Sequence, residues 1–234
     1  MKPTMKQISK ESKMMDDTQR RTYQILTAMK NYLVTTKFAV SKAHRDGRIN
    51  SAHDEDIIVA HLRKRFSKSV FRTSNECGIS NRCWWDIWLV ETNTPVNLKS
   101  STHKSGDNAC NFLALLWALT DVEVEPNRTP HAGRDTAQYI KALRSSILPA
   151  APRDYWFLSI NKCNHEDIVI NSIRGLTKAI PNCNNLPFQI NWSHNKNFVS
   201  RDILKARKYY NDVLKRSFAK DWRLLLYETV QREN

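Results

Sequence analysis

Apolar and polar positions follow two different periods along this chain, and these periods predict where strands and helices lie. Residues 84–90 form an aromatic and aliphatic run interrupted by one acid, Asp86, as expected of a buried strand. Residues 91–94 predict a turn, and Pro95 can open the next strand because a first position needs no amide hydrogen for the ladder. The two segments are therefore expected to form a hairpin.

Side-chain alternation divides the second strand of this hairpin into two faces. Asn97 and Lys99 share one face, whereas Val96 and Leu98 point the other way into apolar packing. An amide and an ammonium are thus expected side by side in hydrophobic surroundings, close to the Asp86 carboxylate.

A helix is expected to open at residues 51–55, with Ser51 or Asp54 as its cap and acids in its first turn. Along it, Glu55 belongs to a stripe of residues at helical spacing that is otherwise apolar. Its carboxylate is therefore expected to approach the core. Alternatively, Glu55 is only an N-terminal charge favoured by the helix dipole.

The remaining pattern predicts a single α/β domain over residues 1–234, in which a central mixed sheet is flanked by helices. Residues 1–15 are polar and basic and predict an N-terminal arm or a frayed terminus. Further helices are expected over residues 16–40, 109–119, 135–147 and 201–227, with Asp107 and Asn108 capping the second of these. Strands expected over residues 155–160, 168–170 and 188–192 would extend the sheet.

The chemistry of the hairpin depends on Asp86, Asn97 and Lys99. Buried charges are costly unless they are paired or coordinate an ion. Asp86 and the Asn97 carbonyl offer the hard oxygens that Mg²⁺ prefers. A water made acidic by the ion could attack a phosphorus atom, and Lys99 could orient that water or stabilise the developing charge. The alternative is a structural salt bridge between Asp86 and Lys99.

Residues 51–119 resemble the PD-(D/E)xK nucleases, the fold family of most type II restriction endonucleases, with Asp86 at the first acid and Lys99 at the lysine. Asn97 stands where the family usually has Asp or Glu, and Trp85 stands where it has Pro. Many members carry a glutamate on the helix before the hairpin, and Glu55 matches that placement. The resemblance implies a restriction-endonuclease-like fold and Mg²⁺-dependent phosphodiester hydrolysis.

The expected function is therefore sequence-specific cleavage of double-stranded DNA by a homodimer. Asp86, Asn97, Lys99 and Glu55 are the expected catalytic residues, and all of them except Lys99 are expected metal ligands. Two alternatives remain open. One is a structure-specific repair or recombination nuclease of the same fold, and the other is a non-catalytic DNA-binding module in which Asn97 marks a lost metal site.

Composition points independently to a polyanionic partner. The chain has 37 Lys and Arg against 23 Asp and Glu, a formal charge of +14 and a pI near 9.7. Arginine and asparagine suit guanine and adenine edges, and short polar or basic groups suit phosphates. The DNA contacts expected on these grounds are Arg45, Arg48, Asn50, Ser101, Lys104, His194 and Lys196.

The sequence argues against several other classes of protein. No apolar stretch approaches the length that spans a bilayer, and the first residues lack the apolar core of a signal peptide, so a cytoplasmic protein is expected. The resemblance to restriction endonucleases implies a prokaryotic one. The five cysteines are irregularly spaced, which favours reduced thiols over a disulfide framework. With only five glycines there is no P-loop or dinucleotide motif, and no small-molecule substrate is expected.

Overall fold

The computed structural model describes most of the chain, namely residues 15–36, 38, 47–78, 83–108, 110–144, 147–149, 151, 153–182 and 187–219. The expected N-terminal arm, apart from residue 15, lies outside the described residues, and so does Arg45.

A mixed five-stranded sheet forms the centre of the fold, as the sequence predicted. Its strands lie side by side in chain order. They are β1 (Phe71–Thr73), β2 (Ile87–Leu89), β3 (Thr94–Ser101), β4 (Trp156–Asn161) and β5 (Asn164–Ser172). The β3–β4 pair is parallel, and the other pairs are antiparallel. The parallel pair requires a long crossover, which two helices supply.

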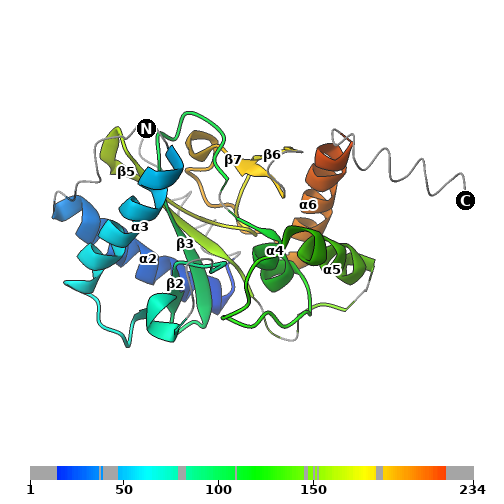
Figure 1. Ribbon diagram of the computed structural model, residues 1–234, viewed down its shortest axis with the longest axis horizontal. Coiled ribbons are helices and arrows are strands. Elements are labelled where there is room, and N and C mark those ends of the chain that lie inside the picture. Colours follow the sequence, from blue (N-terminus) through cyan, green and yellow to red (C-terminus); the bar gives the residue numbers. More distant parts are fainter. Residues whose placement is uncertain are drawn as a thin grey trace, which may run out of the picture.

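Helices cover both faces of this sheet (Figure 1). On one side lie α2 (Asp17–Thr35) and α3 (Gly47–Arg63), and on the other lie α4 (Phe112–Leu119), α5 (Ala132–Arg144) and α6 (Ile203–Phe218). Within the described ranges, no helix is both long and apolar enough to cross a bilayer.

The alternation of each strand sorts its side chains into two separate cores. Leu98 and Leu158 pack with Leu26 of α2 and Leu62 of α3, whereas Phe157 packs on the side of α4, α5 and α6. In β3 this places Val96 and Leu98 in full burial, while Asn97 and Lys99 on the opposite face are only partly buried. The prediction that Asn97 and Lys99 share the face opposite Val96 and Leu98 is confirmed.

Residues 84–90 do not form one continuous strand, because β2 contains only Ile87–Leu89. The indole N–H groups of Trp84 and Trp85 donate to the carbonyls of Glu125 and Pro126, at 3.2 and 2.9 Å. Those two tryptophans therefore pack against the loop after α4 instead of pairing with β3. Because β2 pairs with β3 only as far as Val96, the rest of β3 has no partner from β2 on the side where Asp86 lies.

Residues 188–192 do not extend the main sheet. Instead β7 (Gln189–Ile190) pairs with β6 (Ala179–Ile180) in a separate two-stranded sheet. The backbone groups of Ile190 also exchange two hydrogen bonds of 2.9 Å with those of Asp107. This segment therefore pairs with β6 and with the loop after β3, and the prediction that it extends the main sheet is wrong.

Two predicted helix starts are wrong. Because α3 begins at Gly47, Ser51 and Asp54 lie inside the helix and do not cap it. Helix α4 begins at Phe112, and its cap is Asn111, whose side chain accepts from the amides of Leu113 and Ala114. The residues expected as caps, Asp107 and Asn108, accept hydrogen bonds from Trp192 and Gln189 side chains at 3.0 and 3.1 Å.

The other expected helices are present with shifted ends. Helix α2 is capped by Asp16 and ends at Thr35, before residue 40. Helix α5 begins three residues before its expected start and does not include Ile147, and α6 ends at Phe218. Residues 220–227 of the last expected helix lie outside the described residues.

Candidate active site

Glu55, Asp86, Asn97 and Lys99, the predicted catalytic residues, line one cleft of about 570 Å³. The structure thus brings them together from α3, the residue before β2, and β3. The other residues that line the cleft come from α3, from the end of β1 and the segment after it, and from the stretch before Asp86. They are Asp56, Val59, Thr73, Ser74, Asn75, Cys83 and Trp85.

Asp86 is held at the point where the β2–β3 ladder ends. Its backbone amide donates to the Val96 carbonyl at 3.0 Å, and its Oδ2 accepts from the Leu98 amide at 2.6 Å. The Leu98 amide therefore donates to a side-chain oxygen of Asp86 instead of to a backbone carbonyl of a neighbouring strand. Burial, reinforced by the nearby Glu55 carboxylate, raises the pKa of Asp86 to about 7, against the opposing influence of Lys99 and the Leu98 amide.

Lys99 forms its ion pair with Glu55, at 2.6 Å between Nζ and Oε1, rather than with Asp86. The two side chains are only 14% and 19% exposed. Burial by itself would lower the pKa of Lys99, but the Asp86 and Glu55 carboxylates outweigh it, so that the pKa is raised. Lys99 is therefore an ammonium group fixed by Glu55 and stabilised electrostatically by both carboxylates.

Helix α3 carries a second buried ion pair next to the first. Asp54, which has no exposed surface, lies 2.8 Å from the Nζ of Lys162, just beyond β4. The backbone amide of Lys162 in turn donates to the Ser101 carbonyl at the end of β3, at 2.8 Å. Two consecutive acids thus fix α3 to the ends of two neighbouring strands, and this arrangement places Glu55 in the cleft.

Asn97 has one satisfied and one unsatisfied polar end. Its Nδ2 donates to the Tyr155 hydroxyl at 3.1 Å. Its Oδ1 is buried and has no hydrogen-bond partner among the described residues. A buried carbonyl oxygen without a partner is costly, and an ion or an ordered water is the usual way to satisfy it.

The oxygens of the cleft fit a hard divalent cation. Among the residues that the structure describes, no three His, Cys, Asp or Glu side chains are grouped so as to hold a metal ion. The cleft is lined instead by three acids, Glu55, Asp56 and Asp86, and by Asn97, whose side-chain oxygen is buried and unsatisfied. Such a set suits Mg²⁺, which keeps several waters and takes phosphate oxygens of a substrate as further ligands.

Several cleft residues could not be found from sequence. Thr73 ends β1, and Ser74 and Asn75 follow it; β1 is a three-residue strand too short to give a periodic signal. Cys83 has no reactive thiolate, because burial raises the pKa of its thiol to about 11. Tyr155 is connected to Asn97 only through the pairing of β3 with β4, which local patterns do not show.

Four of the predicted DNA contacts, Ser101, Lys104, His194 and Lys196, do not belong to the cleft. Ser101 ends β3, and its Oγ accepts from the His103 amide at 3.2 Å, while the side chain of Lys104 is exposed on the next loop. His194 is exposed in η2 (Trp192–His194), and Lys196 pairs with Asp167 at 2.7 Å. None of these four described residues lines the cleft. Arg48 and Asn50 belong to the first turns of α3.

A second group of side chains has the atom order of a Ser–His–Asp triad. His103 Nε2 lies 2.9 Å from Ser159 Oγ, and its Nδ1 lies 3.4 Å from Asp167 Oδ2. However, Ser159 has no exposed surface and His103 is 2% exposed, so a substrate cannot reach the hydroxyl. The group instead fixes the loop after β3, where His103 has a φ of 59°.

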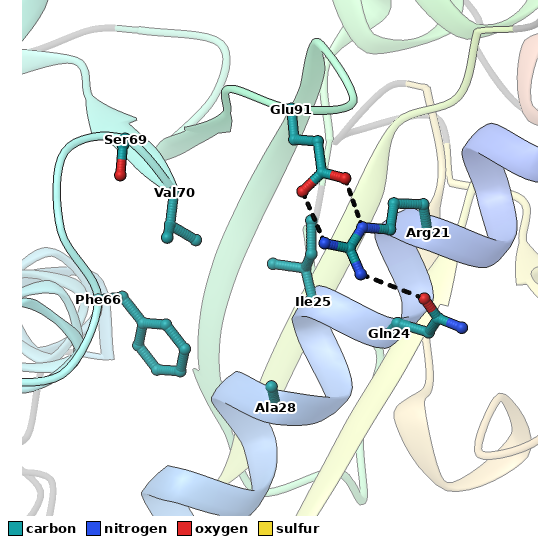
Figure 2. Close-up of a pocket in the computed structure, with 8 residues that line it drawn as sticks. All are labelled: Arg21, Gln24, Ile25, Ala28, Phe66, Ser69, Val70 and Glu91. Carbon is teal, nitrogen blue, oxygen red and sulfur yellow. Dashed lines mark hydrogen bonds and ion pairs between the residues drawn. The ribbon is translucent and has the colours of Figure 1, made fainter.

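Another cavity, of about 260 Å³, lies between α2 and the segments around β1 and β2 (Figure 2). Its polar wall is the ion pair of Arg21 with Glu91, whose two contacts measure 2.5 and 2.8 Å, and Arg21 also donates to Gln24. Both charged side chains are about half exposed and satisfy each other. This cavity therefore offers no group poised for chemistry.

The cleft around Asp86 and Lys99 is thus the best candidate for an active site among the described residues. Its features are a carboxylate with a raised pKa, a buried ammonium group and a carbonyl oxygen without a partner. Comparison with protein-family models, with curated proteins and with solved structures finds no match for this chain.

Proposed function

We propose that this protein is a Mg²⁺-dependent endonuclease that hydrolyses phosphodiester bonds of double-stranded DNA at a specific sequence. The observation that carries the proposal is the convergence of Glu55, Asp86, Asn97 and Lys99 in one cleft. Glu55 comes from a helix distant in sequence from the hairpin that carries the other three. Together they supply the oxygens and the positive charge that phosphoryl transfer requires.

The fold supports the same proposal. A mixed sheet flanked by helices is what the resemblance to PD-(D/E)xK nucleases implies, and this chain has such a sheet. Glu55 reaches the cleft from the helix that precedes the hairpin, as that resemblance also implies. The net charge of +14 gives the protein a general attraction for DNA.

In this mechanism Asp86 and Asn97 would hold the cation, each through an oxygen of a side chain that the protein fixes. Asp86 is fixed by the Leu98 amide, and Asn97 by the Tyr155 hydroxyl. When bound, Mg²⁺ supplies an acidified water as the nucleophile and positive charge for the phosphate oxygens.

Lys99 acts as a charge and not as a base, because its raised pKa keeps it protonated. Its ammonium group stabilises the negative charge that develops on the phosphoryl oxygens. Glu55 holds that ammonium group at 2.6 Å and adds its own carboxylate to the cleft. The side chains are in place before the substrate arrives, so little reorganisation is needed during the reaction.

Digestion of a long, fully sequenced DNA by the purified protein with Mg²⁺ tests this function. We expect discrete fragments that share one terminal sequence and that disappear when EDTA is added. Cleavage only at flaps, junctions or ends would favour a structure-specific nuclease, and retained binding without any cleavage would favour a non-catalytic module. Light scattering of the protein with and without DNA tests the dimer that a palindromic site would require.

The raised pKa of Asp86 predicts that cation binding depends on pH. The carboxyl must lose its proton to bind a cation, and its pKa is about 7, so affinity should fall about tenfold for each pH unit below 7. Above about pH 8 the affinity should be constant. Calorimetric titration with Mg²⁺ or Mn²⁺ from pH 5.5 to 8.5 measures this, and an affinity unchanged across that range would contradict it.

A further inference from the structure

We propose that Tyr155 is a positioning residue that sets the orientation of the Asn97 side-chain amide, so that the carbonyl oxygen and not the NH₂ group is available to the cleft. That a divalent cation is what this oxygen binds rests on the proposed function. The orientation itself follows from hydrogen bonding.

The hydrogen bonds of Tyr155 allow one orientation of Asn97. The Tyr155 hydroxyl lies 2.6 Å from the Trp84 carbonyl oxygen, which can only accept, so the single hydroxyl hydrogen is committed there. The hydroxyl oxygen can therefore only accept from Asn97. It must face the amide nitrogen, 3.1 Å away, which turns the carbonyl oxygen to the other side.

The position of the hydroxyl is fixed by packing. Tyr155 has no exposed surface. Its ring stacks on Trp84 with a centroid separation of 5.9 Å and meets the edge of Phe157 at 5.3 Å.

This arrangement matters because the residue at position 97 is an asparagine. A carboxylate presents an oxygen whichever way it is turned, whereas an amide presents either an oxygen or an NH₂ group. An NH₂ group turned toward the cleft would repel a cation and would be attracted by the cleft carboxylates. The unsatisfied Asn97 oxygen is therefore useful only while Tyr155 holds the amide.

The orientation can be tested without any cation by NMR of protein carrying ¹⁵N-labelled asparagine. The NH₂ signal of Asn97 is identified by its loss in the Asn97→Asp variant. We expect this group to show cross-peaks to the Tyr155 ring and slow hydrogen exchange, and both should be lost in Tyr155→Phe. Rapid exchange in the wild type, or signals unchanged in Tyr155→Phe, would overturn the inference.

Tyr210→Phe is the matched control. Tyr210 is also fully buried, and its hydroxyl donates to a backbone carbonyl, that of Ile173, at 2.7 Å. The two substitutions therefore remove the same kind of bond, but only the one at Tyr155 contacts Asn97. A general loss of stability would change both variants alike, whereas loss of orientation would change only Tyr155→Phe.

Titration with Mn²⁺ then measures the consequence. Tyr155→Phe should weaken binding by about tenfold, the scale typical of a lost outer-shell partner, and Tyr210→Phe should leave it unchanged. In the Asn97→Asp background, Tyr155→Phe should have almost no effect, because a carboxylate needs no orientation. An equal loss in both backgrounds would overturn the inference. If the wild type binds no cation while the NMR result holds, the proposed nuclease function fails and the positioning role of Tyr155 stands.

Discussion

Replacing Lys99 with alanine is expected to lower the rate of DNA cleavage by about a hundred- to a thousandfold, the usual effect of losing one preorganised charge at a phosphoryl or acyl centre. Affinity for DNA should change little, since Lys99 is 14% exposed and is one of many cations on a chain of charge +14. Single-turnover cleavage and equilibrium binding, measured at the same salt concentration, separate the two effects.

Lys162→Ala is the matched control for this substitution. It breaks the neighbouring ion pair of α3, with Asp54 at 2.8 Å, and Lys162 does not line the cleft. Removing one partner of a buried pair costs about 3–5 kcal/mol of the free energy of unfolding, so both variants are compared at a temperature where each remains folded. Lys162→Ala should retain cleavage. Equal losses in the two variants would assign the effect to the placement of α3 and not to the charge of Lys99.

Asp86→Asn is expected to weaken binding of Mg²⁺ or Mn²⁺ by at least about 100-fold, more than the loss of an outer-shell partner normally costs. The substitution removes one negative charge and leaves the shape unchanged. The new amide oxygen can still accept from the Leu98 amide, which the Asp86 carboxylate now accepts from at 2.6 Å. The fold should therefore be retained while the cation site is lost.

The same substitution should stabilise the cation-free protein above neutral pH. The pKa of Asp86 is about 7 in the folded protein against an ordinary value of 3.8, so the folded state binds the proton more tightly. The contribution of the Asp86 carboxyl to the free energy of unfolding is fully present below its ordinary pKa of 3.8 and is lost as the pH rises through about 7. At pH 8 Asp86→Asn should therefore raise the melting temperature, by about 2–4 °C for each kcal/mol recovered. At pH 5 the gain should be much smaller.

Calorimetry and thermal melting of the same sample test both expectations for Asp86. Weaker cation binding together with higher stability cannot arise from a damaged fold. A variant that binds the cation as tightly as the wild type would rule out Asp86 as a ligand. A melting temperature that falls at pH 8 would show that the ionised carboxylate stabilises the fold.

The alternation of β3 illustrates what could be predicted from sequence. Val96 and Leu98 are apolar and Asn97 and Lys99 are polar, so a strand with one face in the core could place them in only one way. Glu55 was predicted to approach the core because it belongs to an apolar helical stripe, and its ion pair with Lys99 confirms that approach. In both cases the signal lies within a few residues of chain.

Element ends were predicted less well, because tertiary contacts decide them. Asp107 and Asn108 are good cap residues by composition, but Trp192 and Gln189 side chains engage them, and Asn111 caps α4 instead. Trp84 looks like part of a strand, yet its indole donates to a carbonyl of the loop after α4. Partners so distant in sequence leave no local pattern.

The sequence by itself determined the class of the fold, the face of β3 that carries Asn97 and Lys99, and the basic charge, since these depend on short-range periodicity and composition. Tertiary structure alone decided that Lys99 pairs with Glu55 and not with Asp86, that Lys162 holds Asp54, and that Tyr155 holds Asn97. Each of those pairs joins residues more than forty positions apart. The physical reason is that strand pairing and helix packing bring such groups together, and burial then changes their pKa values and fixes their hydrogen bonds.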